Sequence, residues 1–280
     1  DITQVVGDFE AEDFSVGGTT KGAITSIAES GEETGLAHAT ALAAAADQYR
    51  ADIIAPTGSG PVRGFGLLNG VLYCFRDSAS GTAGLIWKAT SSGWSQLSLF
   101  YEMDFASGVE LIPDGTAVTQ VGTGATATVK RTVLESGTWG STAAGRLILD
   151  NITGSFNNSG AIQVATVTKV TAASVPAQIS IQPGGRYETR TYNFSGDSST
   201  KRIYGCDGVN RGFELDGETY VPINTNMNTD TPIHVHTHQK QLFFSFDGSN
   251  QNSGVGTPYE WDPITGASEI GLGDNITGYL

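Results

Sequence analysis

The hydrophobic pattern after Pro61 is typical of short β-strands. Apolar and polar residues alternate over brief runs, and each run ends at Gly, Asn, Asp or Ser. Alternation of this kind, bounded by turn residues, predicts strands with one face buried and one face open to solvent. The chain is therefore predicted to be all-β over most of its length.

Three stretches repeat a four-strand pattern, in which a hairpin is followed by two further strands that carry aromatics. The second strands of the three hairpins read "VLYCFRD", "RIYGCDG" and "LFFSFDG", and the strands after them read "GLIWKAT", "GFELDG" and "PYEWDP". Asn69-Gly70 predicts a type I′ turn in the first hairpin. Tyr204 and Phe244 lie about 40 residues apart, the length of one propeller blade.

These units predict part of a β-propeller, completed by further chain or by neighbouring subunits. The final "GDNITGYL" has the pattern of the first strand of another unit. Residues 61–105 are expected to form one blade and residues 186–280 further blades. Between them, residues 106–185 are poor in aromatics and rich in Thr, Val, Ala and Gly, which predicts an inserted small β-sandwich or barrel.

The first 60 residues are predicted to form an acidic N-terminal arm with one helix. Residues 34–53, "TGLAHATALAAAADQYRADI", are dominated by Ala and Leu, and Thr34 can serve as the N-cap. His38 is expected to be a solvent-facing or capped histidine of this helix.

Composition narrows the choice of function. The chain of 280 residues has 37 glycines, 16% charged residues and a net charge of −14. Nonspecific binding to nucleic acid depends on Lys and Arg, so this charge disfavours a general DNA- or RNA-binding surface. Cys74 and Cys206 lie in apolar runs without a C-x-x-C pattern and are expected to be buried free thiols. No apolar run has the length of a membrane span, and no signal peptide or membrane anchor is predicted.

Three of the four histidines, His234, His236 and His238, alternate along one predicted strand. From the first Cα to the third is about 13 Å at the rise of a strand, so one metal ion cannot bind all three imidazoles. A neighbouring pair could chelate, but no Asp, Glu or Cys lies between Pro232 and Phe246 to complete a site. We interpret the histidines as one face of the innermost strand of a blade, near a central channel, with no metal bound.

The remaining candidates for chemistry are weak. Glu102 with Asp104, and Glu260 with Asp262, are carboxylate pairs of the kind a glycosidase needs, yet such pairs are common on solvated strands. The stretches "DGSN" and "GCDGVNRG" fit hairpin turns better than calcium loops. No catalytic, cofactor-binding or metal-ligating residue is predicted, and the chain is not expected to be an enzyme.

The tryptophans could stack on sugars or pack inside the blades. Packing is expected for Trp87 and Trp261, which lie in predicted blade segments. Trp94 is a further candidate for stacking on sugars. Trp139, in the Gly- and Ser-rich "SGTWGST", is the one for which exposure stays open.

Long segments of the chain resemble structural proteins of tailed bacteriophages. The segments are "GSGPVRGFGLLNGVLYCFRDSASGTAGLIWKATSSGWSQL", "GATATVKRTVLESGTWGSTAAGRLIL" and "KRIYGCDGVNRGFELDGETYVPI". The resemblance covers most of the chain after Ala43 and implies a β-propeller tail component, similar to the tail nozzle of short-tailed phages. It brings no catalytic residues, and the chain is shorter than such proteins.

The resemblance implies a non-enzymatic virion protein of the tail, part of a homo-oligomeric ring that forms the DNA ejection conduit. Its expected partners are further copies, other tail proteins such as adaptor and fibres, and DNA in transient passage without sequence-specific binding. The excess of acidic residues is consistent with a wall that repels phosphate. The alternatives are a receptor- or glycan-binding decoration module and, less favoured, a tail-associated glycan depolymerase.

Overall fold

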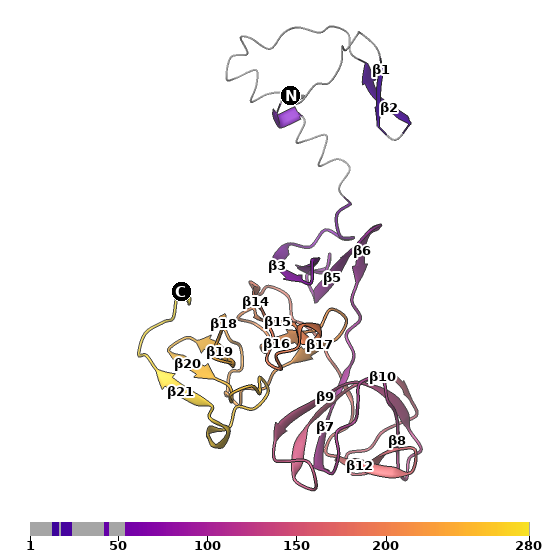
Figure 1. The fold of residues 1–280 in the computed structure, drawn as a ribbon, viewed down its shortest axis with the longest axis vertical. Coiled ribbons are helices and arrows are strands. Elements are labelled where there is room, and N and C mark those ends of the chain that lie inside the picture. Colours follow the sequence, from indigo (N-terminus) through magenta and orange to yellow (C-terminus); the bar gives the residue numbers. More distant parts are fainter. Residues whose placement is uncertain (1–12, 17, 24–41, 45–53, 280) are drawn as a thin grey trace. The chain divides into compact units, whose positions relative to one another are not determined.

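The computed structural model describes residues 13–16, 18–23, 42–44 and 54–279 and divides the chain into two compact units, residues 1–55 and 56–280 (Figure 1). In the first unit, β1 (Asp13–Val16) and β2 (Thr19–Ala23) form an antiparallel hairpin. Residues 42–44 of the predicted helix 34–53 are helical. The other residues of that helix, His38 included, lie outside the described residues.

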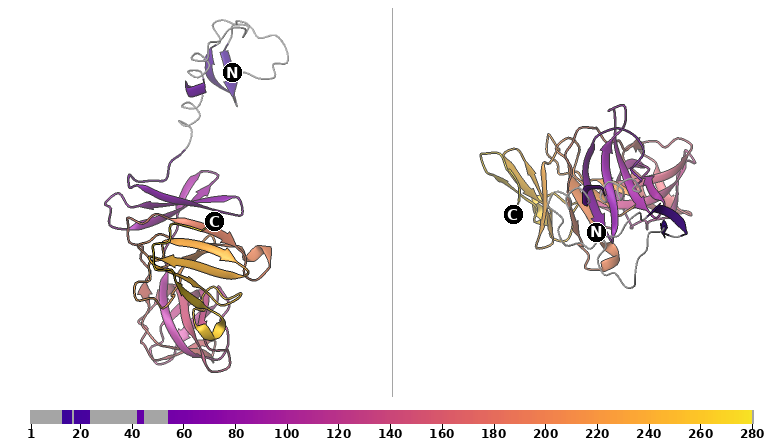
Figure 2. Two further views of the ribbon diagram at one scale, coloured as in Figure 1. Left: turned by 90° about the vertical axis from the view of Figure 1, so that its left-hand side faces the viewer. Right: turned by 90° about the horizontal axis from the view of Figure 1, so that it is seen from above.

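The second unit contains three four-stranded antiparallel sheets, each with its strands in sequence order (Figures 1 and 2). The first sheet consists of β3 (Val62–Leu68), β4 (Val71–Asp77), β5 (Gly84–Thr90) and β6 (Gly93–Gln96). The second consists of β14 (Glu188–Tyr192), β15 (Arg202–Cys206), β16 (Phe213–Leu215) and β17 (Tyr220–Pro222). The third consists of β18 (His234–His238), β19 (Gln241–Phe246), β20 (Ser249–Asn252) and β21 (Ser268–Gly271). The predicted all-β class is confirmed.

A tight two-residue turn joins the first two strands in both the first and the third sheet. Asn69 and Gly70 have φ angles of 50° and 80°, so the predicted type I′ turn between β3 and β4 is confirmed. Between β18 and β19 the turn residues Gln239 and Lys240 also have positive φ, 46° and 61°, although neither is glycine. The hairpin geometry imposes this conformation on residues that rarely adopt it.

The third sheet departs from the sequence prediction at its third strand. "GLIWKAT" is strand β5 and "GFELDG" contains β16, but "PYEWDP" is not a strand. The third strand is "SNQN", and the segment after it loops out before the 3-10 turn η2 (Pro263–Thr265). Proline on both sides of "YEW" removes two ladder N–H donors, which explains why the segment does not pair.

The predicted further strand "GDNITGYL" is also not a strand among residues 273–279. The segment folds back toward the third sheet instead. Ile276 N donates to Asp247 O at 3.1 Å, and the Tyr279 ring lies 5.6 Å from the His236 ring. Aromatic packing and backbone hydrogen bonds therefore hold this segment without adding a strand.

Between the first and second sheets the chain forms a closed barrel (Figure 1). The pairings run β10–β9–β8–β11–β12–β7 and return from β7 to β10. The strands are β7 (Tyr101–Gly108), β8 (Ala117–Gln120), β9 (Thr126–Ser136), β10 (Ala143–Thr153), β11 (Ala161–Val164) and β12 (Val167–Ala172), and the short β13 (Ala177–Gln178) adds to β7. Closure leaves no free edge within this ring.

The barrel begins earlier in the chain than the sequence suggested. β7 starts at Tyr101, inside the segment expected to be the first blade. The barrel interior has its own core, with Met103, Leu147 and Val129 all fully buried. On its outer surface, Val133 and Ile148 join the core between the first and second sheets. The barrel therefore belongs to the same compact unit as the sheets.

The three sheets pack face to face in chain order. We call the face of a sheet that is turned toward the preceding sheet its front face, and the opposite face its back face. Phe75 and Tyr73 of the first sheet meet Ile203 of the second in one core, and Tyr204 of the second meets Phe244 of the third in another. Each contact joins the back face of one sheet to the front face of the next.

This packing corrects the repeat inferred from Tyr204 and Phe244. Tyr204 lies on the back face of the second sheet, whereas Phe244 lies on the front face of the third, because it is paired with Val235 in the same core. The two rings fill one core from opposite sides. Their separation in sequence is therefore a property of that core and does not mark equivalent positions in two units.

The first strands of the three sheets are neighbours: β14 contacts both β3 and β18. Gly64 allows the close approach of β3, because a Cβ there would lie 2.7 Å from Tyr187 Cβ. Thr189 Oγ1 donates to Phe65 O at 3.1 Å, and Thr191 Oγ1 donates to Leu67 O at 2.7 Å. Two carbonyls of the edge strand β3 are thus satisfied by side chains rather than by another strand.

Candidate functional site

A dense group of charged and polar side chains lies where the barrel meets the second sheet. We call this group the ionic junction; it consists of Glu102, Arg131, Glu135, Arg146, Arg211, Glu214, Asp216 and Asn224. Strands β7, β9 and β10 contribute the barrel side, and the second sheet with its loops contributes the other side. The junction ties segments far apart in sequence into one unit.

Arg146 lies at the centre of the junction and is only 1% exposed. Its guanidinium donates to Glu135 Oε1 at 2.9 Å, to Glu102 Oε2 at 2.7 Å and to the carbonyl of Pro222 at 2.6 Å. Three partners in different directions satisfy a buried charge that would otherwise be costly to desolvate.

Arg211 and Asn224 hold the two carboxylates that bind Arg146. Arg211 Nη2 donates to Glu102 Oε1 at 2.5 Å, and Arg211 Nη1 donates to Asn224 Oδ1 at 2.6 Å. Asn224 Nδ2 in turn donates to Glu135 Oε1 at 3.0 Å. The contacts run from Glu102 of the barrel through Arg211 and Asn224 on the sheet side to Glu135 of the barrel, so they join the two parts.

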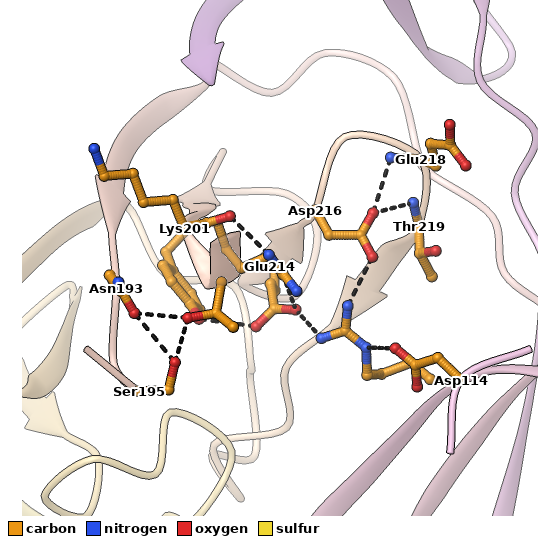
Figure 3. A network of polar contacts seen from close by, with 12 residues as sticks. Asp114, Asn193, Ser195, Lys201, Glu214, Asp216, Glu218 and Thr219 are labelled. Carbon is orange, nitrogen blue, oxygen red and sulfur yellow. Dashed lines mark hydrogen bonds and ion pairs between the residues drawn. The ribbon is translucent and has the colours of Figure 1, made fainter. Parts of the chain in front are cut away.

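Arg131 forms the other half of the junction, and its partners Asp114, Glu214 and Asp216 are labelled in Figure 3. Its guanidinium nitrogens lie 2.6 Å from Glu214 Oε1, 2.7 Å from Asp216 Oδ2 and 3.1 Å from Asp114 Oδ2. Asp216 also accepts from the backbone N–H groups of the turn that follows it. Tyr204 Oη donates to Glu214 Oε2 at 2.8 Å, which extends the network into the core between the second and third sheets.

The electrostatics of the junction favour permanent charge rather than proton transfer. Burial alone would raise the pKa of Glu102, but the guanidinium groups of Arg211 and Arg146 hold it below its usual value. Burial and the Glu214 carboxylate raise the pKa of Tyr204. A carboxylate held ionised by two arginines and a phenol held neutral are poorly suited to general acid–base work near neutral pH.

The sequence contained one signal for this junction that our prediction did not use. The run "LIL" at 147–149 in β10 is apolar at successive positions, which is typical of a strand buried on both faces. Leu147 and Leu149 face the barrel interior, while Ile148 faces the sheets. Arg146 shares that outer face, so its burial follows from the same pattern.

In each carboxylate pair considered for catalysis, the two members have different environments in the structure. Glu102 and Asp104 share the outer face of β7, but Glu102 belongs to the junction and Asp104 is exposed. Asp262 caps η2, accepting from Ile264 N at 2.9 Å. Burial raises the pKa of Glu260, against a hydrogen bond from Thr257 that lowers it. Neither pair is assembled as two carboxylates facing one opening.

The histidines lie on one face of β18, and each has a different environment. His234 Nδ1 lies 2.8 Å from Glu188 Oε2 of the neighbouring strand β14. His236 packs on Tyr279, and His238 is exposed at the end of the strand. The carboxylate that the local sequence lacks thus comes from the second sheet. Among the residues the structure describes, no group of three or more His, Cys, Asp or Glu side chains could hold a metal ion.

The aromatic and sulfur side chains are packing residues. Trp87 and Trp261 are buried, and Trp261 stacks on Phe244 with ring centroids 5.5 Å apart, so their expected packing role is confirmed. Trp139 is partly buried and stacks on Phe105 of the barrel core at 5.9 Å. The two cysteines, Cys74 and Cys206, are buried free thiols, as predicted.

Both stretches considered as calcium loops are turns. "DGSN" connects β19 to β20. In "GCDGVNRG", Asp207 Oδ1 accepts from the backbone N–H groups of Val209 and Asn210, which closes an Asx turn.

An open cavity of about 630 Å³ borders the junction. Its charged lining is mixed, with three cations and three anions: Lys88, Lys130, Arg202, Asp114, Asp216 and Glu218. Most of these groups already pair with one another or with neighbours, as Lys88 does with Glu218 at 3.8 Å. The cavity therefore presents no excess of one charge to a ligand.

Fold and junction together define an all-β protein in which a closed barrel is held to a stack of antiparallel sheets by buried ion pairs. No known protein family, no curated protein and no solved structure matches the chain. In the part of the chain that the structure describes, no helix has the length and apolar character needed to cross a membrane.

Proposed function

We propose that this chain is a non-enzymatic structural component of a bacteriophage tail, forming part of a ring at the nozzle or tube end through which DNA is ejected. The observation that carries the proposal is the face-to-face stack of the three four-stranded sheets, with β3, β14 and β18 side by side. Consecutive propeller blades have this arrangement, with their first strands nearest the axis.

Two further observations support a structural role. Arg131 of the barrel binds Glu214 and Asp216 of the second sheet, and Arg146 of the barrel donates to the Pro222 carbonyl, so buried charges bond the barrel to the second sheet. The resemblance to tail proteins inferred from the sequence points to the same role. A wall that carries forces during ejection needs rigidity, and ion pairs in a network resist displacement better than isolated ones.

The charge of the chain fits a conduit. A net charge of −14 gives little affinity for phosphate, so passing DNA is repelled rather than retained. The same charge suits a soluble decoration protein, and the sheet stack is therefore the stronger support.

A cryo-EM reconstruction of the particle that carries this chain tests the proposal. We expect a symmetric ring of copies around an axial channel, with the first strands of the sheets nearest the axis. A peripheral position away from any channel would overturn the proposal and favour the receptor- or glycan-binding alternative. In that case retention of the Trp139→Ala variant on host polysaccharide would be the next measurement.

A further inference from the structure

Two cavities of the second unit meet at the ion pair between Lys88 and Glu218. One is the cavity of about 630 Å³ that borders the ionic junction, and the other has a volume of about 460 Å³. Lys88 and Glu218 line both cavities, and we call the two cavities together the polar groove. Each volume is in the range of about 300–1,000 Å³ that is typical of sites for small molecules.

Three parts of the fold supply the walls of the polar groove. The first sheet contributes the β3–β4 turn and residues of β5 and β6. The barrel contributes Lys130 and Asp150, and the second sheet contributes the turn at residues 216–219. Ligand sites form preferentially at boundaries between packed parts of a protein. The groove is therefore assembled by the tertiary fold rather than by one local motif.

One wall of the groove is held in place by hydrogen bonds. In the turn at residues 216–219, Asp216 Oδ1 accepts from Glu218 N at 2.9 Å and from Thr219 N at 2.7 Å (Figure 3). The other carboxylate oxygen of Asp216 accepts from Arg131 at 2.7 Å, and Tyr73 Oη donates to Gly217 O at 3.3 Å. The turn is thus ordered before a ligand binds, which lowers the entropy lost on binding.

The ion pair between Lys88 and Glu218, by contrast, is loose. The two charged atoms lie 3.8 Å apart, which is beyond hydrogen-bond distance, and the side chains are 30% and 77% exposed. Exposed pairs of this kind contribute little to stability. Lys88 is therefore able to donate to a ligand, and Glu218 to accept from one, with little loss to the fold.

Much of the remaining lining forms hydrogen bonds without carrying charge. These hydroxyl and amide side chains are Asn69, Ser95, Gln96, Ser98, Ser199 and Thr219. The half-buried ring of Phe100 lines the second cavity, and Lys130 Nζ lies 5.0 Å from the centroid of that ring. Donors, acceptors and an apolar ring thus line the same groove.

This mixture of groups favours one class of ligand. A purely apolar ligand would take the hydroxyls and amides out of water without giving them partners, which is unfavourable. An ion of either sign would meet groups of its own sign, because the cavity beside the junction is lined by three cations and three anions. A neutral sugar avoids both problems: each of its hydroxyls donates and accepts, and the C–H face of its ring packs against an aromatic side chain.

We propose that the polar groove binds a neutral oligosaccharide, with one part of it in each cavity and the Lys88–Glu218 pair between them. Lys88 donates to one sugar hydroxyl and Glu218 accepts from another, in place of their long contact with each other. The site goes beyond the proposed ring function and does not depend on it, because the groove is formed within a single copy of the chain.

Binding of neutral oligosaccharides to the full chain tests the site. The probes are an array of uncharged oligosaccharides, followed by calorimetry in solution with the one that binds best, and tetragalacturonate is the acidic counterpart. We expect saturable binding of the neutral probe to one site per chain. Tetragalacturonate should bind at least about tenfold more weakly, because the net charge of −14 repels it.

Variants of the ion pair locate the binding site. Lys88→Met and Glu218→Leu should each lower the affinity about tenfold, because each removes a charged hydrogen-bonding group. Glu218→Gln should keep most of the affinity, since the amide oxygen still accepts. The matched controls are Lys169→Met and Glu110→Leu, which break a lysine–glutamate pair of the barrel outside the groove and should leave the affinity unchanged. Circular dichroism checks that the variants keep the fold.

Each result supports or overturns the inference. Absence of saturable binding to every probe of the array would overturn it, and so would a preference for tetragalacturonate. Binding that Lys88→Met and Glu218→Leu leave unchanged would refute the groove as the site. The position of the chain in the particle tests the proposed function alone, so the two proposals fail or stand separately.

Discussion

Replacing Arg146 by Met removes the central cation of the ionic junction while keeping most of the side-chain volume. The substitution leaves Glu102 and Glu135 facing each other without the guanidinium between them, and it leaves the Pro222 carbonyl without its donor. Buried groups that lose their partners keep their desolvation cost and lose the compensating interaction.

The expected loss of stability follows from the burial of the groups. Removing one partner of a buried ion pair costs about 3–5 kcal/mol. The carboxylates of Glu102 and Glu135 are 21% and 23% exposed, so water solvates them in part. They also retain Arg211 and Asn224. We therefore expect the lower end of the range, about 3 kcal/mol in the free energy of unfolding.

Urea unfolding of the wild-type and Arg146→Met chains measures this loss. Tryptophan fluorescence reports on both sides of the junction, because Trp139 packs against the barrel core and Trp261 against the core between the second and third sheets. We expect a lower midpoint, and a separate barrel transition if the junction is what couples the two parts. Adding Glu135→Gln should recover part of the loss, since it removes an unpaired charge.

Arg190→Met is the matched control. Arg190 lies 3.9 Å from Glu188, but its side chain is 44% exposed, and exposed pairs of this kind contribute little. The reasoning is refuted if Arg146→Met lowers the free energy of unfolding by less than about 1 kcal/mol, or if Arg190→Met costs as much.

Three further outcomes are expected. The free energy of unfolding should fall as pH drops below about 4.5, because the pKa of Glu102 is lowered in the folded state and the unfolded chain binds more protons there. In urea titrations at several pH values, Glu102→Gln should reduce the dependence of the free energy of unfolding on pH, and an unchanged dependence would contradict this. Cys74 and Cys206 should react with a thiol reagent only on unfolding, since burial raises the pKa of both; labelling of the native chain would refute this. Gly212→Val should lower the free energy of unfolding by about 1–3 kcal/mol, because the added Cβ would lie 2.3 Å from the Phe244 ring. A melting temperature equal to that of the wild type would refute the close packing.

The sequence predicted the strands better than their association. Alternation and the Asn69-Gly70 turn give β3 and β4 directly, because both signals are local. Closure of the barrel depends on β7 meeting β10, which are separated by two other strands in sequence, and no local pattern encodes that pairing. The strand predicted for "PYEWDP" was wrong because its aromatic residues favour a strand while its prolines oppose one, and the prolines decide the outcome.

The spacing of residues in the sequence could not predict which side chains meet in the ionic junction. Arg146 and Glu102 are 44 residues apart, and Arg211 and Glu102 are 109 apart. Charged residues on strands are usually solvated, and apart from the apolar run beside Arg146, only tertiary packing shows that these are buried. The histidines show the same limit, since the carboxylate beside His234 comes from another sheet.

The hydroxyls of Thr189 and Thr191 have a consequence for how the chain behaves at high copy number. A hydroxyl that donates to a β3 carbonyl occupies that acceptor. It does not add a further strand to which another strand could pair. Strands of other copies therefore find these acceptors of the edge already in use, and runaway strand addition is discouraged. Many identical chains can then be concentrated in one place during assembly while contacts between them are left to the faces of the sheets.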